Sequence, residues 1–255
     1  MIWHFIIMSS SYSLGRRIAL DVSFQGAIEQ KTIDSCIRQI MEKCGSDVSI
    51  STHLLSTKAE SWESVVDSDL FFQDVKKINT IEEFCNLIRQ DQKLSGMDVA
   101  NYILSKVKCT HLKLEKLTYF CYADYLCNKK RRLFQDNIYA FRYGPVIDSV
   151  YQEFKKHGHD TIELEEKEWP KAQDIQERMP EPLTGSRILF SKNGIEKMES
   201  IDRTLEMYGQ LSAGALVSLT HRKGSPWDLS GRGEGIYRNI TDENILNGHK
   251  VEISR

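Results

Sequence analysis

The hydrophobic pattern at the start of the chain changes between a period of two, typical of strands, and a period of 3.6, typical of helices. Met1–Met8 is an apolar opening and Arg17–Phe24 is a second apolar run, so both are predicted strands. Ala27–Cys44 has helical spacing, and Val48–Leu54 alternates as a strand does. Asp69–Val75 is a further predicted strand. We therefore expect a small N-terminal domain that mixes helices and strands.

A change of pattern separates this region from the rest of the chain. Thr80-Ile-Glu-Glu83 has the spacing of a capping box and predicts a helix with Phe84 and Leu87 on one face. Asp91–Gly96 is a short polar stretch that ends in glycine, and amphipathic helices follow it. We expect an accessory α+β domain over residues 1–95 and a mainly helical domain over residues 96–255.

The second region reads as helices with a short strand or two. Apolar stripes predict the helices Met97–Val107, Leu112–Asn128, Lys192–Met207 and Ser212–Leu219. Ile138–Tyr143 alternates as a strand, and Gly144-Pro145 is expected to end it and to open a helix that reaches His157. The acidic stretch Glu163–Glu168 and the prolines after it predict a solvated excursion. The fold class predicted for the whole chain is α+β.

Composition and charge narrow the function classes. The 255 residues are 40% hydrophobic with a net charge of -2, so a folded core is expected and no global field favours nucleic acid or an anionic membrane. The six cysteines form no CxxC pair, which is typical of a reducing cytoplasm. Met1–Met8 lacks the basic start and the length of a signal peptide, and no stretch is long enough to span a membrane. A soluble cytoplasmic protein is the expectation.

Candidate chemistry is sparse. The basic run of Lys129, Lys130, Arg131 and Arg132 lies among aromatic residues, which leaves nucleic-acid binding as an alternative to a solvated helix end. His157, His159, His221 and His249 have no metal-ligand spacing, and Gly231–Gly235 lacks the GK[ST] ending of a phosphate loop. No paired carboxylates or activated cysteine suggest catalysis. We expect no enzyme, no metal and no cofactor.

Four segments in one order resemble a known domain. They are Met97–Ser105, His111–Phe120, Phe141–Tyr151, and Tyr208–Ala213 followed by Leu219-Thr-His221 and Ser225-Pro-Trp227. Together they resemble the Panacea domain of antitoxins, a family with SocA-like and phage-associated GepA-like members. The resemblance covers about Met97 to Ile240, and residues 1–90 lie outside it.

The resemblance implies a helical domain that neutralises a cognate protein toxin, generally encoded by an adjacent gene, through direct contact. The toxin contacts that it suggests are Lys113, Lys116, Tyr119, Arg142, Tyr143 and His221, with Gly144, Pro145 and Trp227 in structural roles. Alternatives are a proteolytic adaptor that delivers the toxin to a protease, and a regulator that binds operator DNA. Homo-oligomer formation stays open. Arg142 and Tyr143 are favoured as contacts because arginine and tyrosine are enriched in binding hot spots.

Overall fold

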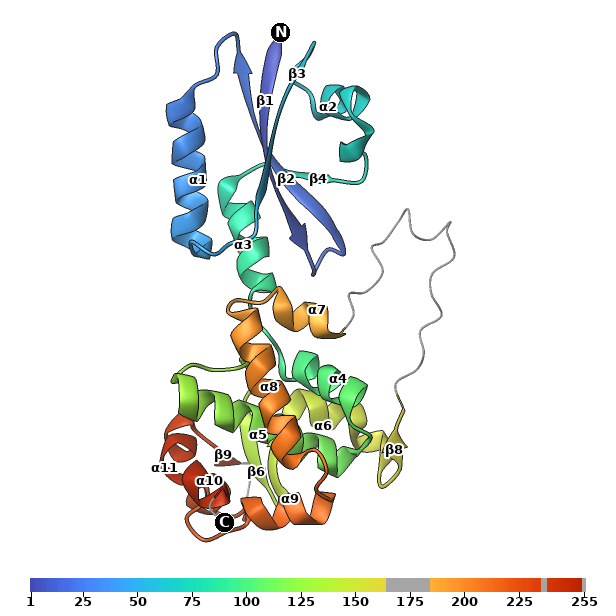
Figure 1. Cartoon of the computed structure of the whole chain (residues 1–255), viewed down its shortest axis with the longest axis vertical. Coiled ribbons are helices and arrows are strands. Elements are labelled where there is room, and N and C mark those ends of the chain that lie inside the picture. The colour runs from blue at the N-terminus through green and yellow to red at the C-terminus, as the bar shows by residue number, and fades with distance from the viewer. Residues whose placement is uncertain (164–183, 235–237, 254–255) are drawn as a thin grey trace. The chain divides into compact units, whose positions relative to one another are not determined.

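The chain is described by a computed structural model that covers residues 1–163, 184–234 and 238–253. These residues form two compact units that divide between Gln92 and Lys93 (Figure 1). Unit 1 contains residues 1–92, and unit 2 contains the described residues from Lys93 onward. The predicted α+β class is confirmed, because unit 1 is built on a sheet and unit 2 is mainly helical. The assignment of 1–95 and 96–255 as domains stays a prediction.

Unit 1 is organised by a four-stranded sheet in the order β3-β1-β2-β4. β1 (Ile2–Ser11) and β2 (Arg16–Gln25) form an antiparallel hairpin. β3 (Ser51–Thr57) pairs antiparallel with β1, and β4 (Lys76–Ile78) pairs parallel with β2. The two predicted strands at the start of the chain are therefore present.

Helices cover both faces of this sheet. α1 (Gln30–Cys44) and α3 (Ile81–Asp91) pack on the face that carries Ile7. α2 (Trp62–Ser68) and a 3₁₀ turn at Leu70–Phe72 pack on the face that carries its neighbour Ile6, on the opposite side of the sheet in Figure 1. Alternate side chains of a strand point to opposite faces, so a strand buried on both sides reads as an unbroken apolar run.

Two predicted elements of unit 1 differ in the structure. Asp69–Val75, expected as a strand, contains the 3₁₀ turn, because the Asp69 carboxylate accepts a hydrogen bond from the Phe71 amide and turns the chain. The predicted strand Val48–Leu54 is displaced toward the C-terminus and forms β3. Thr80 caps α3 as predicted, since its hydroxyl accepts from the Glu83 amide.

Unit 2 is built around one buried helix, α5 (His111–Lys129), in which every residue from Leu114 to Leu126 is buried. The longer helices around it are α4 (Gly96–Lys106), α8 (Gly194–Tyr208) and α11 (Asp242–Ile253). Shorter ones are α6 (Asp148–Phe154), α7 (Thr184–Leu189), α9 (Ala213–Thr220) and α10 (Pro226–Leu229). A helix with neighbours on all sides has no solvated face, so the predicted stripe on α5 understates its burial.

Short strands complete unit 2. β6 (Ile138–Phe141) lies between β7 (Gly144–Ile147) and β9 (Arg238–Asn239), and β5 (Cys109–Thr110) pairs with β8 (Thr161–Ile162). The prediction that Gly144-Pro145 opens a helix is wrong, because both residues belong to β7. Pro145 is tolerated there since β7 is an edge strand, which does not need every amide for pairing.

Some sequence expectations fall on undescribed residues. Of the predicted acidic excursion Glu163–Glu168, Glu163 is described and exposed, and the remainder lies outside the described residues. None of the helices in the described ranges is both long and apolar enough to cross a membrane. The six cysteines are free thiols, five of them buried.

We expect Phe120→Ala to destabilise unit 2 by about 3–5 kcal/mol, the usual cost of deleting a buried phenylalanine. Phe120 is fully buried on α5 and its ring stacks on Tyr208 with centroids 4.7 Å apart. The free energy of unfolding, measured by urea denaturation, checks this. Phe190→Ala is the matched control, because Phe190 is 76% exposed and its loss is expected to cost under about 0.5 kcal/mol. Equal losses for the two variants would contradict the packing described.

Candidate functional site

The tight connection between β6 and β7 places Arg142 and Tyr143 on the surface of unit 2. The Tyr143 side chain is 61% exposed, and Arg142 is exposed beside it. The Arg142 guanidinium carbon lies 5.6 Å from the centre of the Tyr143 ring, within cation–π range. Gly144 and Pro145, which follow, are buried. This β6–β7 connection therefore presents two side chains and buries the backbone that follows them.

Two aromatic rings hold the first half of the β6–β7 connection. Trp227, on α10, donates its indole N–H to the Phe141 carbonyl oxygen at 2.7 Å. His221, at the end of α9, has Nε2 3.2 Å from the Arg142 carbonyl oxygen. The centroids of the Trp227 and His221 rings are 3.8 Å apart, so each ring restrains the other. The backbone of Phe141 and Arg142 is thereby fixed from a segment far along the chain.

Two charged side chains of α5 hold the second half. The buried Lys116 ammonium donates to the Pro145 carbonyl oxygen at 2.7 Å. The Glu115 carboxylate accepts from the Ile147 amide at 3.0 Å. Burial lowers the pKa of Lys116 to about 8, against the opposing charge of Glu115. β7 is thus attached to the central helix through its backbone groups.

Gly144 is required where the β6–β7 connection approaches α5. Its φ of +102° lies in the left-handed region that side chains disfavour. A Cβ at this position would be 2.8 Å from Thr220 Oγ1 and 2.9 Å from Lys116 Cε. The missing side chain therefore lets the connection sit directly on the lysine stem.

The residues predicted as toxin contacts differ in exposure. Arg142 and Tyr143 are exposed, Lys113 and His221 are half-buried, and Lys116 and Tyr119 are fully buried. The prediction for Lys116 and Tyr119 is corrected, because a side chain without surface cannot touch a partner; both support the unit from within. Gly144, Pro145 and Trp227 are buried, and their structural roles stay a prediction.

A buried polar cluster lies deeper in unit 2 and was not predicted from the sequence. His249 of α11 has Nε2 2.7 Å from Asp124 Oδ1 and Nδ1 2.7 Å from Glu252 Oε2. The Tyr119 hydroxyl donates to Glu252, and the Thr204 hydroxyl donates to Asp124. The cluster joins α5, α8 and α11. The only sequence signal was Asp124, an acidic residue within the aromatic-rich second half of α5.

Electrostatics favour a charged imidazole in this cluster. Burial alone lowers the pKa of His249, but hydrogen bonds and charge from Asp124 and Glu252 outweigh it and raise the pKa to about 9. Burial raises the pKa of Glu252, partly offset by His249. All five side chains of this cluster are buried, so it connects the three helices from inside the unit.

The basic run predicted as an alternative nucleic-acid site is engaged in ion pairs. Lys129 Nζ lies 2.9 Å from Glu196, and Arg131 lies 2.5 Å from the same carboxylate. Arg132 Nε lies 2.7 Å from Asp242. Lys130 ends α5 in the left-handed conformation. These pairs neutralise much of the local positive charge, which reduces the attraction for phosphates that motivated the alternative.

Two further features considered in the sequence are the histidines and the glycine-rich segment Gly231–Gly235. No three or more His, Cys, Asp or Glu side chains among them are grouped to hold a metal ion. Gly158 has a φ of +54° and ends the turn after His157. Gly233 lies against the backbone of Phe141, because a Cβ at this position would be 2.6 Å from the Phe141 carbonyl carbon. Of the segment Gly231–Gly235, Arg232 and Glu234 are exposed, Gly231 and Gly233 are half-buried, and Gly235 lies outside the described residues.

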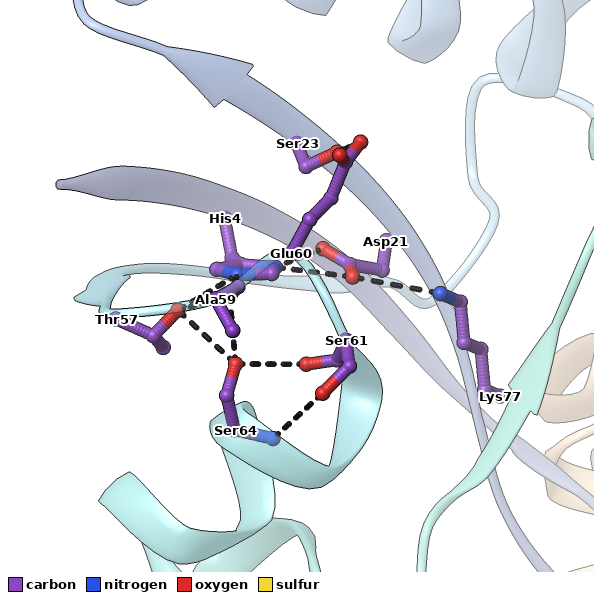
Figure 2. Close-up of polar contacts among 9 residues, drawn as sticks. All are labelled: His4, Asp21, Ser23, Thr57, Ala59, Glu60, Ser61, Ser64 and Lys77. Carbon is purple, nitrogen blue, oxygen red and sulfur yellow. Dashed lines mark hydrogen bonds and ion pairs between the residues drawn. The ribbon is translucent and has the colours of Figure 1, made fainter.

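Unit 1 has a polar cluster of its own (Figure 2). His4 Nδ1 lies 3.0 Å from both oxygens of Asp21, and its Nε2 lies 3.1 Å from Thr57 Oγ1. The Ser64 hydroxyl is 3.0 Å from the Thr57 hydroxyl, and Lys77 lies 3.7 Å from Asp21. The row crosses all four strands of the sheet and reaches α2. An acid, a histidine and a hydroxyl also form hydrolytic triads, but His4 and Thr57 are buried here, whereas the nucleophile of a triad must meet its substrate.

Comparison with known proteins places these features in context. The Panacea domain of the SocA-like antitoxins matches residues 114–228, a stretch that begins in α5 and ends in α10. Antitoxin SocA of Caulobacter vibrioides (strain NA1000 / CB15N) is 30% identical over 155 aligned positions, and the match covers 58% of this chain and 77% of that protein. No solved structure gives a significant match. The family match includes the β6–β7 connection together with Lys116, His221 and Trp227, which hold it.

We predict that His249 titrates with a midpoint near 9, against its ordinary 6.5. Its folded pKa is raised, so its contribution to stability is fully present below pH 6.5 and is lost as the pH rises through about 9. Lys116 and Lys197, with pKa values lowered to about 8, change stability in the opposite direction over an overlapping range. The measurement is therefore an NMR titration of the imidazole ring protons, assigned by the signal that His249→Asn removes.

The same titration has an internal control. Asp124→Asn removes one of the two charges that face the imidazole, so the midpoint of His249 is expected to fall in a variant that remains folded. A midpoint at the ordinary value in the unaltered protein would contradict a charged brace.

Proposed function

Because this chain belongs to the SocA-like antitoxin family, whose members carry the Panacea domain, we propose that it neutralises a cognate protein toxin by binding it directly. Family membership confirms the resemblance inferred from the sequence. The observation that carries the proposed contact is the β6–β7 connection, where Arg142 and Tyr143 project from a backbone that other residues hold in place.

The proposed contact is favourable because its backbone is ordered before binding. Ordering a flexible loop at an interface costs free energy, and a loop already fixed by hydrogen bonds avoids that cost. Arginine and tyrosine are the residue types most often found at binding hot spots, together with tryptophan. Arg142 combines a charge with a planar donor surface, so an acidic or carbonyl-rich patch on the toxin is its natural complement.

Two half-buried residues extend the proposed surface. His221 contacts the Arg142 carbonyl oxygen, and Lys113 lies one helical turn before Lys116 on α5. A stable complex buries roughly 1,200–2,000 Å² in total, which is more than two side chains provide. Further contacts from unit 2 are therefore part of the proposal.

Neutralisation by occupancy needs no catalytic group or cofactor from this chain. We infer that the toxin is inactivated because its active site or its substrate path is covered. The proposed partner is the product of an adjacent gene, and the proposed location is the reducing cytoplasm, which suits the free thiols of this chain.

We expect Arg142→Ala and Tyr143→Ala each to weaken binding of the adjacent-gene toxin about 5- to 30-fold, the usual range for a hot-spot residue. Both side chains are exposed, so the free energy of unfolding of unit 2 is expected to stay unchanged. Titration calorimetry with the purified toxin measures the affinity, and growth on co-expression measures the neutralisation.

Arg203→Ala is the matched control, because Arg203 is an exposed arginine on α8 of the same unit. It is expected to bind the toxin as the unaltered protein does. If the neighbouring product is harmless when expressed alone, or stays toxic beside this protein, the antitoxin proposal fails. If neutralisation survives loss of both Arg142 and Tyr143, the proposed surface fails while the function stands.

A further inference from the structure

β3 is an unprotected edge of the sheet in unit 1. It pairs with β1 on one side, and no described strand pairs with its other side. Its register with β1 runs without a bulge from Ser51 to Thr57. Leu54, at its centre, is 52% exposed. An edge of this kind offers unpaired amide and carbonyl groups to another strand.

The opposite edge of the same sheet is protected. β4 has only three residues, and two of them are Lys76 and Lys77. Short length and lysine are two of the devices by which proteins prevent edge pairing. β3 is seven residues long, with the sequence STHLLST, and contains no lysine, no acid and no proline. The contrast within one sheet indicates that the β3 edge is left open for a strand.

The open edge is also rigid. Thr57, at its end, is held by the polar cluster of unit 1, through His4 on β1 and Ser64 on α2 (Figure 2). On the inner face, the ring of His53 lies 5.2 Å from that of Phe71, and Leu55 packs against the buried cluster that contains Ile6. A strand fixed in its paired conformation loses little entropy when a second strand is added.

We propose that the occupant of this edge is β3 of a second copy of the chain, in antiparallel pairing around a two-fold axis at Leu54. In that register Leu54 faces Leu54 of the second copy, and Thr52 faces Ser56 on either side. Leucine therefore meets leucine and hydroxyl meets hydroxyl on this face. His53 meets Leu55 on the other face, and no charged pair is opposed. Such self-complementarity is what a two-fold interface requires, and the pairing joins the two sheets into one. The inference is independent of the toxin proposal, since it concerns unit 1 alone.

Cross-linking tests the register. Leu54→Cys is expected to link two copies under mild oxidation or with a short bis-maleimide, because the axis places the residue opposite itself. Thr52→Cys is expected to link poorly to itself but well to Ser56→Cys in a mixture. Leu70→Cys, at a leucine of unit 1 that is 74% exposed and outside β3, is the control, and the unaltered chain gives the background. Linking of Leu70→Cys as efficient as that of Leu54→Cys would overturn the proposal.

The oligomeric state gives a second readout that needs no cysteine. Light scattering at increasing concentration is expected to show a mass approaching twice the 29.5 kDa of the chain. Leu54→Lys places the two introduced charges opposite each other across the axis, and it is expected to raise the dissociation constant of the dimer at least tenfold. Leu70→Lys is expected to leave that constant unchanged. A monomer at every concentration, or a dimer that Leu54→Lys does not weaken, overturns the proposal.

Discussion

The buried ammonium of Lys116 is the contact on which the proposed toxin surface depends. A charged amine removed from water is costly unless polar groups receive it. Here the Pro145 carbonyl accepts its hydrogen bond, and the adjacent Glu115 supplies an opposing charge. The lysine can reach that carbonyl because Gly144 has no side chain in its path. Lys116 of α5, Gly144 and the Pro145 carbonyl of β7 therefore depend on one another. Without the close approach that Gly144 allows, both the ammonium and the carbonyl would lose this hydrogen bond.

The same helix supports unit 2 at its other end. Tyr119 and Asp124 of α5 reach Glu252 and His249, so α11 is attached to the centre of the unit by charge and not only by apolar packing. Two contacts cross between these helices, His249 to Asp124 and Tyr119 to Glu252, while Glu252 orients the imidazole from within α11. Together they restrict the relative rotation of the two helices. A toxin that binds the β6–β7 connection would therefore meet a framework braced from within.

The sequence predicts what is decided locally and misses what depends on distant partners. The helix boundaries near Met97 and Asn128 follow from capping residues and from hydrophobic spacing. The distinction between Arg142-Tyr143 as contact residues and Gly144-Pro145 as turn residues follows from local turn chemistry. Lys116 was expected at the surface, because lysine side chains are usually exposed. It can be buried because the Pro145 carbonyl, 29 residues away in the sequence, accepts its hydrogen bond. His249 gave no signal, since its partner Asp124 lies 125 residues away. Pro145 was misplaced because an edge strand and a helix start tolerate proline equally.

The two proposed surfaces use different parts of the chain for recognition. Pairing at β3 depends on backbone groups, which every sequence supplies, so its selectivity rests on register and on the absence of opposed charge. In the β6–β7 connection, backbone carbonyl groups are engaged by Trp227, His221 and Lys116, so recognition there depends on the side chains of Arg142 and Tyr143. A change of Arg142 or Tyr143 would alter the partner without disturbing the support. A chain that keeps these buried contacts can therefore change at Arg142 or Tyr143 and still fold.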